Sequence, residues 1–373
     1  MEFGVVRKDV ETAARVGRLS TAHGSFDTPV FMPVGTQGSV KAMSPGELRE
    51  IGFGIILGNT YHLSLRPGAE IVARAGGLRS FMSWDGAILT DSGGYQVFSL
   101  AALRGITADG VSFRSHIDGA AHFLGPVEAI RIQEALGSDI MMVLDECTPY
   151  PCTPDYACKS LERSLEWALR CKNARRSERA ALFGIVQGAT YPEARRRSAE
   201  GLVRIGFDGY AIGGLSVGEP AHLMLENVSE CCRVLPAESP RYLMGCGTPV
   251  EIVEAVARGV DMFDCVMPTR NGRNGTAFTD RGKLPVKNGR FKADFRPIED
   301  GCCCAACRNH TRAYLRHLFN AGEMLGPRLV TYHNLHYYHR LMARVREAVA
   351  AGTFARFARD FIEGYTDGGG MDE

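Results

Sequence analysis

Residues 182–212, LFGIVQGATYPEARRRSAEGLVRIGFDGYAI, decide the fold. The stretch begins and ends with a short apolar run, at 182–186 and 209–212, and such runs are typical of strands buried on both faces. Between them Pro192 opens a segment with a helix pattern, since proline is favoured in the first helical turn. The stretch therefore predicts a strand, a helix and a second strand parallel to the first.

The same unit recurs along most of the chain. Its eight apolar runs lie at residues 30–34, 54–58, 87–90, 139–144, 182–186, 209–212, 241–244 and 262–266. Further helix starts are indicated by Ser44-Pro45, Pro126, Thr153-Pro154 and Thr248-Pro249. Eight alternations of strand and helix within about 250 residues favour an α/β protein with a closed (β/α)8 TIM barrel over an open doubly wound sheet.

One segment interrupts this repeat. FRSHIDG and AHFLG alternate apolar and polar residues on either side of Asp118-Gly119, a pair typical of tight hairpin turns. We therefore expect a hairpin inserted in the barrel, within about residues 92–125.

The composition is that of a folded protein. The chain has 373 residues, 45% of them hydrophobic, and its 43 basic and 42 acidic residues give a net charge of +1. These values exclude a disordered chain. We find neither a signal sequence nor about 18 consecutive uncharged apolar residues, so we expect a cytoplasmic protein without a membrane partner. Most of the 12 cysteines are scattered among apolar segments, which favours reduced thiols over a disulfide framework.

Four cysteines cluster near the C-terminus, and three of them have metal-ligand spacing. Cys302, Cys304 and Cys307 are followed by His333, and three thiolates with one imidazole complete a closed tetrahedral zinc site. We predict one structural Zn²⁺ per subunit. Three alternatives stay open: Cys303 could replace a neighbouring thiolate, another histidine (His310, His317 or His336) could replace the imidazole, or the cysteines could be buried free thiols.

The cysteines lie in a basic tract. Residues 270–317 hold eleven Lys and Arg against four Asp and Glu, which indicates a polyanionic partner, with nucleic acid first, or else a solvated surface. Helical segments follow near 311–321 and 335–351. We therefore predict a barrel core over residues 1–268, a zinc-binding subdomain with associated helices over 269–351, and a C-terminal helix and tail over 352–373.

Polar residues follow several of the predicted strands. Asp91, Asp145, Gln187 and Asp264 each stand at or just after the end of an apolar run, and the C-terminal ends of barrel strands converge on one mouth. Two carboxylates of unlike role suit substitution at a glycosidic or N-glycosidic carbon. The glycines of DSGGYQ and IGGLSVGE leave main-chain N–H groups open to a flat ligand such as a purine. Helix caps, loop salt bridges and tight turns are the structural alternatives.

These motifs together resemble a known family, the bacterial tRNA-guanine transglycosylases (queuine tRNA-ribosyltransferases). The resemblance covers nearly the whole chain. It rests on DSGGYQ at 91–96, DECTPY at 145–150, GIVQG at 184–188, GGLSVGE at 213–219, DMFDCVMPTRNGRNG at 261–275, and the cysteine cluster with its later histidine. The family fold is a barrel with an inserted zinc subdomain.

The resemblance implies a reaction and a role for each site residue. Asp264 is the nucleophile on C1′ of the wobble guanosine of tRNA, and Asp91 is the general acid/base. The expected base-binding residues are Asp145, Gln187, Gly214, Leu215, Tyr95 and Met244, with the last two sandwiching the purine. Guanine leaves, a covalent ribosyl-aspartate remains, and an incoming 7-deazaguanine displaces it with net retention.

The resemblance also bears on substrate and partners. Val217, where eukaryotic relatives have glycine, implies the small base 7-aminomethyl-7-deazaguanine (preQ1), as in queuosine biosynthesis, and Glu219 can act on its charge through the backbone. Arg270 and Arg273 look like tRNA contacts. The family forms homodimers, with HTRAYLRHL at 310–318 at the interface. His310 and Ala189 depart from the family pattern, which usually has tryptophan and glycine there.

Two other functions are consistent with parts of the sequence. A glycoside hydrolase could use Asp91 and Asp264 on sugars, although only Trp84 and Trp167 are available as tryptophan platforms and neither stands at a predicted strand end. A non-catalytic RNA-binding module would use the zinc cluster and the basic tract but leaves the strand-end carboxylates unexplained.

Overall fold

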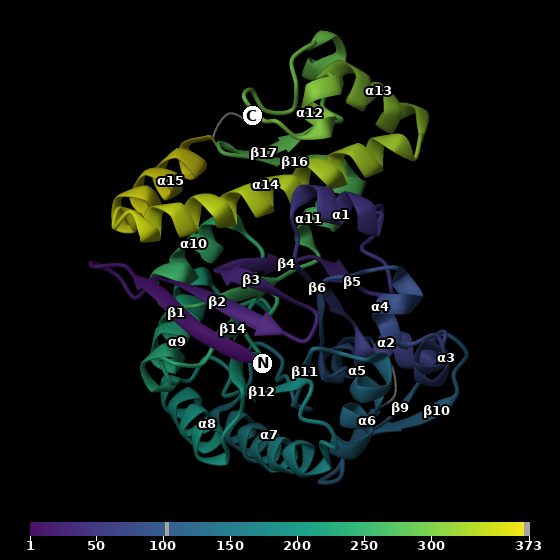
Figure 1. Cartoon of the computed structure of the whole chain (residues 1–373), viewed down its shortest axis with the longest axis vertical. Helices are drawn as coiled ribbons and strands as arrows, with labels where there is room; N and C mark the ends of the chain where they lie inside the picture. The colour runs from purple at the N-terminus through teal and green to yellow at the C-terminus, as the bar shows by residue number, and fades with distance from the viewer. Residues whose placement is uncertain (101–103, 369–373) are drawn as a thin grey trace.

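The computed structural model describes residues 1–100 and 104–368, and its centre is a parallel sheet rolled into a barrel (Figure 1). The strand order is β4-β15-β14-β13-β12-β11-β7-β6-β5. These strands are β4 (Val30–Met32), β5 (Val34–Gly35), β6 (Ile55–Gly58), β7 (Ala87–Thr90), β11 (Ile140–Met142), β12 (Ala181–Val186), β13 (Gly209–Ile212), β14 (Arg241–Leu243) and β15 (Met262–Asp264). Each of the eight predicted apolar runs contains a strand.

The barrel closes through its first apolar run, which Pro33 divides into β4 and β5. β4 pairs with β15 and β5 pairs with β6, so the run joins the two ends of the sheet. Pro33 lacks an N–H group, but its carbonyl accepts a hydrogen bond from the amide of Leu57 at 2.9 Å. The predicted (β/α)8 barrel is confirmed, with this break in one strand.

Helices surround the barrel, as Figure 1 shows. They are α1 (Pro45–Ile51), α2 (Thr60–Leu65), α3 (Ala69–Arg74), α4 (Gly77–Met82), α5 (Gly94–Leu100), α6 (Pro126–Leu136), α7 (Pro154–Ala174), α8 (Pro192–Ile205), α9 (Ala221–Val234), α10 (Pro249–Ala257) and α11 (Met267–Asn274). All five predicted proline starts are confirmed. Ser44, Thr153 and Thr248 cap their helices by accepting a main-chain N–H, which satisfies a donor that the first turn leaves open.

An antiparallel sheet at the N-terminus was not predicted from the sequence. It consists of β1 (Glu2–Lys8), β2 (Arg15–Thr21) and β3 (Gly24–Thr28). Buried Arg15 forms a two-pronged ion pair with Asp261, the residue just before β15. The sheet therefore covers the N-terminal ends of the barrel strands and leaves their C-terminal ends for a functional site.

The predicted hairpin is confirmed, but the insertion is larger than a hairpin. β9 (Val111–Arg114) and β10 (Ala121–Leu124) pair antiparallel around the Asp118-Gly119 turn, and β8 (Arg104–Ile106) adds a third strand beside β9. Helix α5 precedes this sheet. Residues 101–103, which fall within the predicted insertion, lie outside the described residues.

The C-terminal part adds a small sheet and several helices. Its elements are β16 (Thr276–Thr279), β17 (Gly282–Pro285), the 3-10 helix η1 (Gly289–Ala293), α12 (Ala305–Asn309), α13 (Arg312–Ala321), α14 (Leu325–Ala350) and α15 (Phe354–Gly368). The prediction of a helix over 335–351 was correct in place but too short, because α14 begins at Leu325. In the described part of the chain, no helix is long and apolar enough to cross a membrane.

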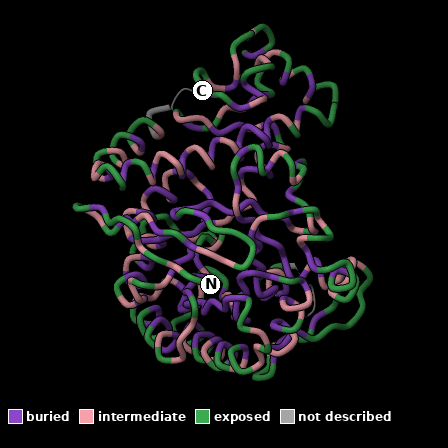
Figure 2. Tube along the Cα trace, in the orientation of Figure 1, coloured by how far each residue is buried: buried purple, intermediate pink, exposed green. Residues whose placement is uncertain are grey.

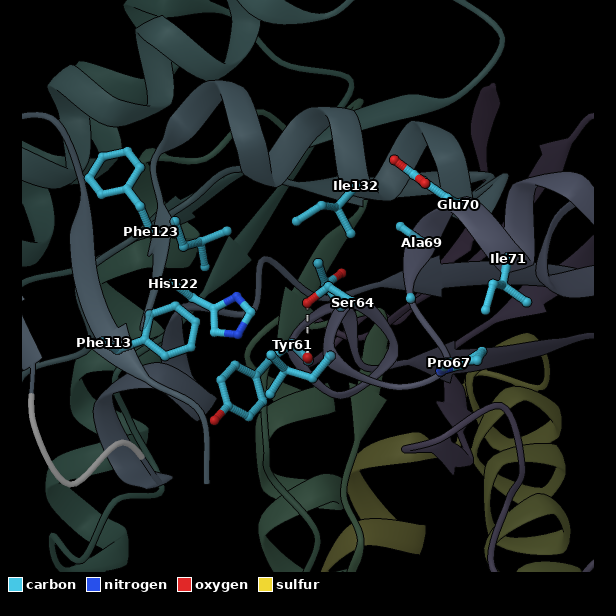
Figure 3. A pocket seen from close by; sticks show the side chains of 14 residues that line it. Tyr61, Ser64, Pro67, Ala69, Glu70, Ile71, Phe113, His122, Phe123 and Ile132 are labelled. Carbon is cyan, nitrogen blue, oxygen red and sulfur yellow. Dashed lines mark hydrogen bonds between the residues drawn. The ribbon is translucent and has the colours of Figure 1, made fainter. Parts of the chain in front are cut away.

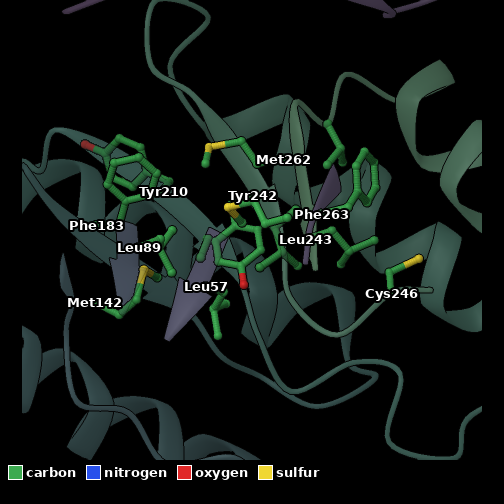
Figure 4. Packing of buried hydrophobic residues seen from close by; sticks show 14 of the residues in the cluster. Leu57, Leu89, Met142, Phe183, Tyr210, Tyr242, Leu243, Cys246, Met262 and Phe263 are labelled. Atoms are coloured by element: carbon green, nitrogen blue, oxygen red, sulfur yellow. The ribbon is translucent and has the colours of Figure 1, made fainter. Parts of the chain in front are cut away.

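The hydrophobic core crosses the predicted domain boundary. One buried cluster joins the barrel interior to the C-terminal half of α14 and to α15, and another joins α1 and α4 to the cysteine segment. Figure 2 shows buried residues continuing from the barrel into α14, and Figure 4 shows the packing around Tyr242. The boundaries at 268 and 351 stay predictions.

Candidate functional site

Four polar residues meet at the C-terminal mouth of the barrel. Asp91 follows β7, Asp145 lies three residues after β11, Gln187 follows β12, and Asp264 ends β15. Asp91 and Asp145 are 7% and 6% exposed, Gln187 is fully buried, and Asp264 is half-buried. Gln187 bonds to Asp145, Ser92 next to Asp91 also bonds to Asp145, and the charge of Asp264 acts on Asp91, so the four lie in one site.

Asp145 and Gln187 form the floor of this site. The Gln187 Nε2 donates to Asp145 Oδ2 at 2.6 Å, and Ser92 Oγ donates to Oδ1 at 3.1 Å. Burial raises the pKa of Asp145 to about 6. The buried Oε1 of Gln187 has no hydrogen-bond partner among the described residues, so it is an acceptor that a ligand N–H can satisfy.

Gly214 lies directly against this orphaned oxygen. Its φ is +63°, and a Cβ added there would lie 2.2 Å from Gln187 Oε1. Only glycine therefore fits, both for the backbone conformation and for the close approach. The structure brings together three of the predicted base-binding residues: Asp145, Gln187 and Gly214.

Asp91 is held by three donors. Asn59 Nδ2 and Gln96 Nε2 donate to Oδ2 at 2.5 and 2.8 Å, and the Thr60 amide donates to Oδ1 at 2.7 Å. Burial nevertheless raises the pKa of Asp91 to about 6, and the nearby charge of Asp264 adds to the rise. Sequence reasoning missed Asn59 and Thr60, although they directly follow a predicted strand, as the chosen aspartates do.

Asp264 is oriented by the neighbouring strand. Tyr242 donates its hydroxyl to Oδ1 at 2.5 Å, and the Gly245 amide donates to the same oxygen at 2.9 Å. Burial raises the pKa of this carboxyl, while the two hydrogen bonds lower it. Tyr242 was also missed, because an aromatic residue inside an apolar strand is indistinguishable from a core residue in the sequence.

Tyr95 and Met244 lie at the rim. Tyr95, in the first turn of α5, is 53% exposed; burial raises the pKa of its hydroxyl, and the charge of Arg270 lowers it. The Met244 sulfur lies 3.5 Å from the Cβ position of Gly213. Both side chains thus border the mouth, although nothing lies between them to test the predicted sandwich.

Glu219 acts on the main chain of the loop after β13. Its carboxylate accepts the amide hydrogens of Ser216 and half-buried Val217, at 2.5 and 2.9 Å. The carbonyl and N–H of a trans peptide point in opposite directions. The Leu215 carbonyl, which shares a peptide with the Ser216 amide, is therefore turned away from Glu219.

Arg270 and Arg273 project from α11, directly after Asp264. Arg270 is exposed, whereas Arg273 is half-buried and its Nη1 has no hydrogen-bond partner among the described residues. Burial and the charge of Arg270 lower the pKa of Arg273. Two adjacent guanidinium groups with an unsatisfied donor suit an anion such as phosphate.

The predicted metal ligands form one buried cluster. The donor atoms of Cys302, Cys304, Cys307 and His333 all lie within 4.8 Å of one another. The three sulfurs are 3.8, 3.5 and 3.3 Å from His333 Nδ1, spacings that fit the corners of a tetrahedron with metal bonds of about 2.0–2.3 Å. His333 Nε2 donates to the Phe278 carbonyl at 2.8 Å, which leaves Nδ1 as the ligand atom.

The structure also decides between the alternative ligands. Cys303 is exposed, and its sulfur lies 3.6 Å from His336 Nε2, outside the buried group. Within the described residues, none of the three competing histidines (His310, His317 and His336) belongs to the cluster. These four donors can hold a metal ion in a closed site.

The structure has two cavities of note, one beside the inserted sheet and one in the C-terminal part. One, of about 440 Å³, lies between α2–α3 and the inserted sheet, with Tyr61, Phe113 and His122 in its wall (Figure 3). The other, of about 820 Å³, is lined by five residues of the predicted basic tract, Arg281, Lys283, Arg290, Arg296 and Arg312, together with four acidic residues. The basic tract therefore includes a concave surface of mixed charge.

The chain is similar to known proteins over nearly its whole length. Residues 9–367 match the family model described as queuine tRNA-ribosyltransferase. Proteins of that name from Caldanaerobacter subterraneus subsp. tengcongensis and Syntrophobacter fumaroxidans are 57% and 58% identical to this chain, covering 98% and 97% of both partners. The protein of that name from Symbiobacterium thermophilum is 57% identical over 97% of this chain and 91% of its own. The chain belongs to the queuine tRNA-ribosyltransferase family.

Proposed function

We propose that this protein is a pentosyltransferase that exchanges guanine at the wobble position of tRNA for preQ1, a step of queuosine biosynthesis. The observation that carries the proposal is the meeting of Asp91, Asp145, Gln187 and Asp264 at one barrel mouth, with the oxygen of Gln187 unpaired. Asp145 and Gln187 supply hydrogen-bond donors and acceptors for the edge of a purine. Asp91 and Asp264 supply two further carboxylates for the chemistry at C1′.

The purine is read by complementary hydrogen bonds. Ionised Asp145 accepts from N1–H and the exocyclic amine, and the Gln187 amide both donates and accepts. The amides of Gly214 and Leu215 bind O6. Tyr95 and Met244 cover the two faces of the ring, and the exposed ring of Tyr95 is the kind of platform on which unstacked bases lie.

The exchange proceeds by double displacement. Asp264 Oδ1 is occupied by Tyr242 and Gly245, so Oδ2 attacks C1′ as guanine leaves. The covalent ribosyl-aspartate is then opened by the incoming base at the same carbon, and two inversions give retention. Asp91, with a pKa of about 6, gives and takes the ring-nitrogen protons near neutral pH.

The preference for preQ1 depends on the loop of Leu215 to Glu219. Because Glu219 holds the Ser216 amide, the Leu215 carbonyl faces the other way and can accept a hydrogen bond from the aminomethyl ammonium. Val217 leaves room for a small 7-substituent only. We expect Val217→Gly to lower the KM for the bulkier base queuine and to leave guanine exchange unchanged. An unaltered queuine KM would refute the role of Val217.

The partners follow from the remaining predicted residues. Arg270 and Arg273 contact the nucleotides that flank the target base, and the basic tract adds phosphate contacts. The closed Cys3His cluster binds a structural Zn²⁺, one per subunit. Two copies pair through residues 310–318, where His310 stacks on Tyr314 with ring centroids 5.2 Å apart. A cytoplasmic location stays a prediction.

The glycoside hydrolase alternative has no support from the tryptophans. Trp84 is 2% exposed and Trp167 is fully buried, so neither offers a platform for a sugar at the mouth. No further observation favours it.

An exchange assay tests the proposal. Incubation of the protein with radiolabelled guanine and unmodified tRNA should place label in the RNA, and a denaturing gel should reveal a covalent adduct. Asp264→Asn should abolish the adduct while tRNA binding persists. Asp85→Asn, on the exposed surface, is the matched control and should behave as the unmodified protein. An adduct in Asp264→Asn would assign the nucleophile to another residue.

A further inference from the structure

Arg195, in α8, is a buried arginine that serves only main-chain carbonyls. Its side chain is fully buried, and no carboxylate among the described residues pairs with it. The guanidinium instead donates to four carbonyl groups: those of Ala189 at 2.7 Å, Val186 at 3.0 Å, Gly213 at 2.6 Å and Gly214 at 3.0 Å. Burial of a charge without a counter-ion is unfavourable. The hydrogen bonds to these four carbonyls are therefore what stabilises the guanidinium of Arg195.

The four carbonyls lie at the ends of two neighbouring strands of the site. Val186 is the last residue of β12 and Ala189 is two residues beyond Gln187, while Gly213 and Gly214 directly follow β13. One guanidinium group thus connects two main-chain segments. One segment carries Gln187, and the other carries Gly214, which lies against the side-chain amide of Gln187. Arginine suits this task because its five N–H donors lie in a rigid fork, whereas lysine has a single nitrogen.

The contacts also fix the direction of two amide hydrogens. The Gly213 carbonyl shares a peptide with the Gly214 N–H, and the Gly214 carbonyl shares one with the Leu215 N–H. Since both carbonyls point to Arg195, both N–H groups point away from α8. Neither N–H has a hydrogen-bond partner among the described residues. Two successive N–H groups on one side of the chain form a concavity that binds an oxygen.

We propose that Arg195 is a positioning residue that aims the amides of Gly214 and Leu215 at the O6 atom of the purine, and that it thereby selects bases with a 6-oxo group. This inference rests on the proposed function. The inference goes beyond the proposed function because it assigns the selection of the 6-oxo group to a residue that touches neither the base nor the RNA.

Competition between two bases separates this role from a merely structural one. Arg195→Lys keeps the charge but cannot reach both segments, and Arg196→Lys is the matched control on the exposed side of the same helix, where Arg196 pairs with Glu230. The preference for guanine over 2-aminopurine, which lacks O6 and with it the N1–H, is measured as the ratio of their inhibition constants in the tRNA exchange assay. The preference should fall at least ~10-fold in Arg195→Lys, mainly through weaker guanine binding, and stay unchanged in Arg196→Lys.

Each outcome decides the inference. Arg195→Lys with lower activity but an unchanged preference would overturn it, because only folding would then depend on Arg195. Absence of exchange by the unmodified protein would instead overturn the proposed function. If Arg195→Lys does not fold, a crystal structure of the unmodified protein with guanine decides. The inference requires the Gly214 and Leu215 nitrogens within ~3.2 Å of O6 and the Gly213 and Gly214 carbonyls on Arg195. A flipped peptide at either position would overturn it.

Discussion

The hydroxyl of Tyr242 donates to Oδ1 of Asp264 at 2.5 Å, across the ends of the neighbouring strands β14 and β15. The tyrosine ring is fully buried in the barrel interior (Figure 4), so its hydroxyl is held in place by core packing. Asp264 therefore has a fixed orientation before any substrate arrives. Such preorganisation reduces the rearrangement that the reaction needs.

Tyr242→Phe should slow the exchange and shift its pH dependence. A hydrogen bond to a carboxylate lowers its pKa, so loss of the Tyr242 hydroxyl raises the pKa of Asp264 further. The acidic limb of the rate profile should move to higher pH, and kcat should fall roughly 10- to 100-fold. The measurement is kcat against pH with saturating tRNA. An unshifted acidic limb would show that this bond does not control the ionisation of Asp264.

The affinity for guanine should rise with pH around 6. Asp145 has a pKa of about 6, above its ordinary value of 3.8, and only the ionised form can accept from both N1–H and the amine. Below pH 6 protonation competes with binding, so the dissociation constant should increase by up to ~10-fold for each pH unit. Asp145→Asn should bind weakly and without this dependence. Asp91→Asn should keep the pH dependence of guanine affinity. If the Asp91→Asn variant lost this pH dependence, the titrating group would be Asp91 and not Asp145.

Removal of one thiolate should release the metal. Cys304→Ala should lose the metal ion of this site and lower the melting temperature, because metal binding contributes to folding and Cys304 packs in the cluster that joins α1 and α4 to the C-terminal part. Cys303→Ala is the matched control, since Cys303 is exposed and outside the buried donor group. Elemental analysis and thermal unfolding give the two readouts. A metal-free protein of unchanged stability would contradict a structural role.

Arg273 should contribute to tRNA affinity through charge. Its buried Nη1 has no partner among the described residues, and a phosphate would supply one. Arg273→Ala should raise the KM for tRNA and reduce the slope of log affinity against log salt by about 1, while the KM for the base stays unchanged. Titration at several salt concentrations measures this slope. A slope equal to that of the unmodified protein would exclude a phosphate contact.

Ala189 occupies a backbone conformation that favours glycine. Its φ is +51°, in the left-handed region, which costs a residue with a Cβ about 1 kcal/mol. Ala189→Gly should therefore raise the free energy of unfolding by up to about 1 kcal/mol. Ala199→Gly, at a buried position within α8, should lower it by about 1 kcal/mol, since glycine weakens a helix interior. Chemical denaturation of both variants checks the opposite signs.

Local patterns in the sequence predicted much of the molecule. The eight apolar runs, the proline starts and the Asp118-Gly119 turn all depend on residues close together in the chain, and each gave the correct element. The strand-end aspartates could be placed at one mouth because barrel topology alone brings those ends together. The cysteine spacing likewise indicates the metal site, whose donor atoms the fold brings together.

Other features depend on which distant groups meet, and no local pattern predicts that. Arg195, Arg196 and Arg197 are adjacent in the sequence, and only the turn of α8 against the barrel buries the first of them. Tyr242 has the pattern of a core residue until β15 places Asp264 beside its hydroxyl. The choice of His333 among the nearby histidines required the three-dimensional packing of α14 against the cysteines.

The sequence by itself thus determined the barrel and the residue types at its mouth, because both follow from hydrophobic period and from the residues that end each run. The tertiary structure alone decided the closure at Pro33, the cover over the N-terminal ends of the strands, and the donors that orient Asp91 and Asp264. These are pairings between groups far apart in the chain, and their partners become known only when the fold brings them within hydrogen-bond distance.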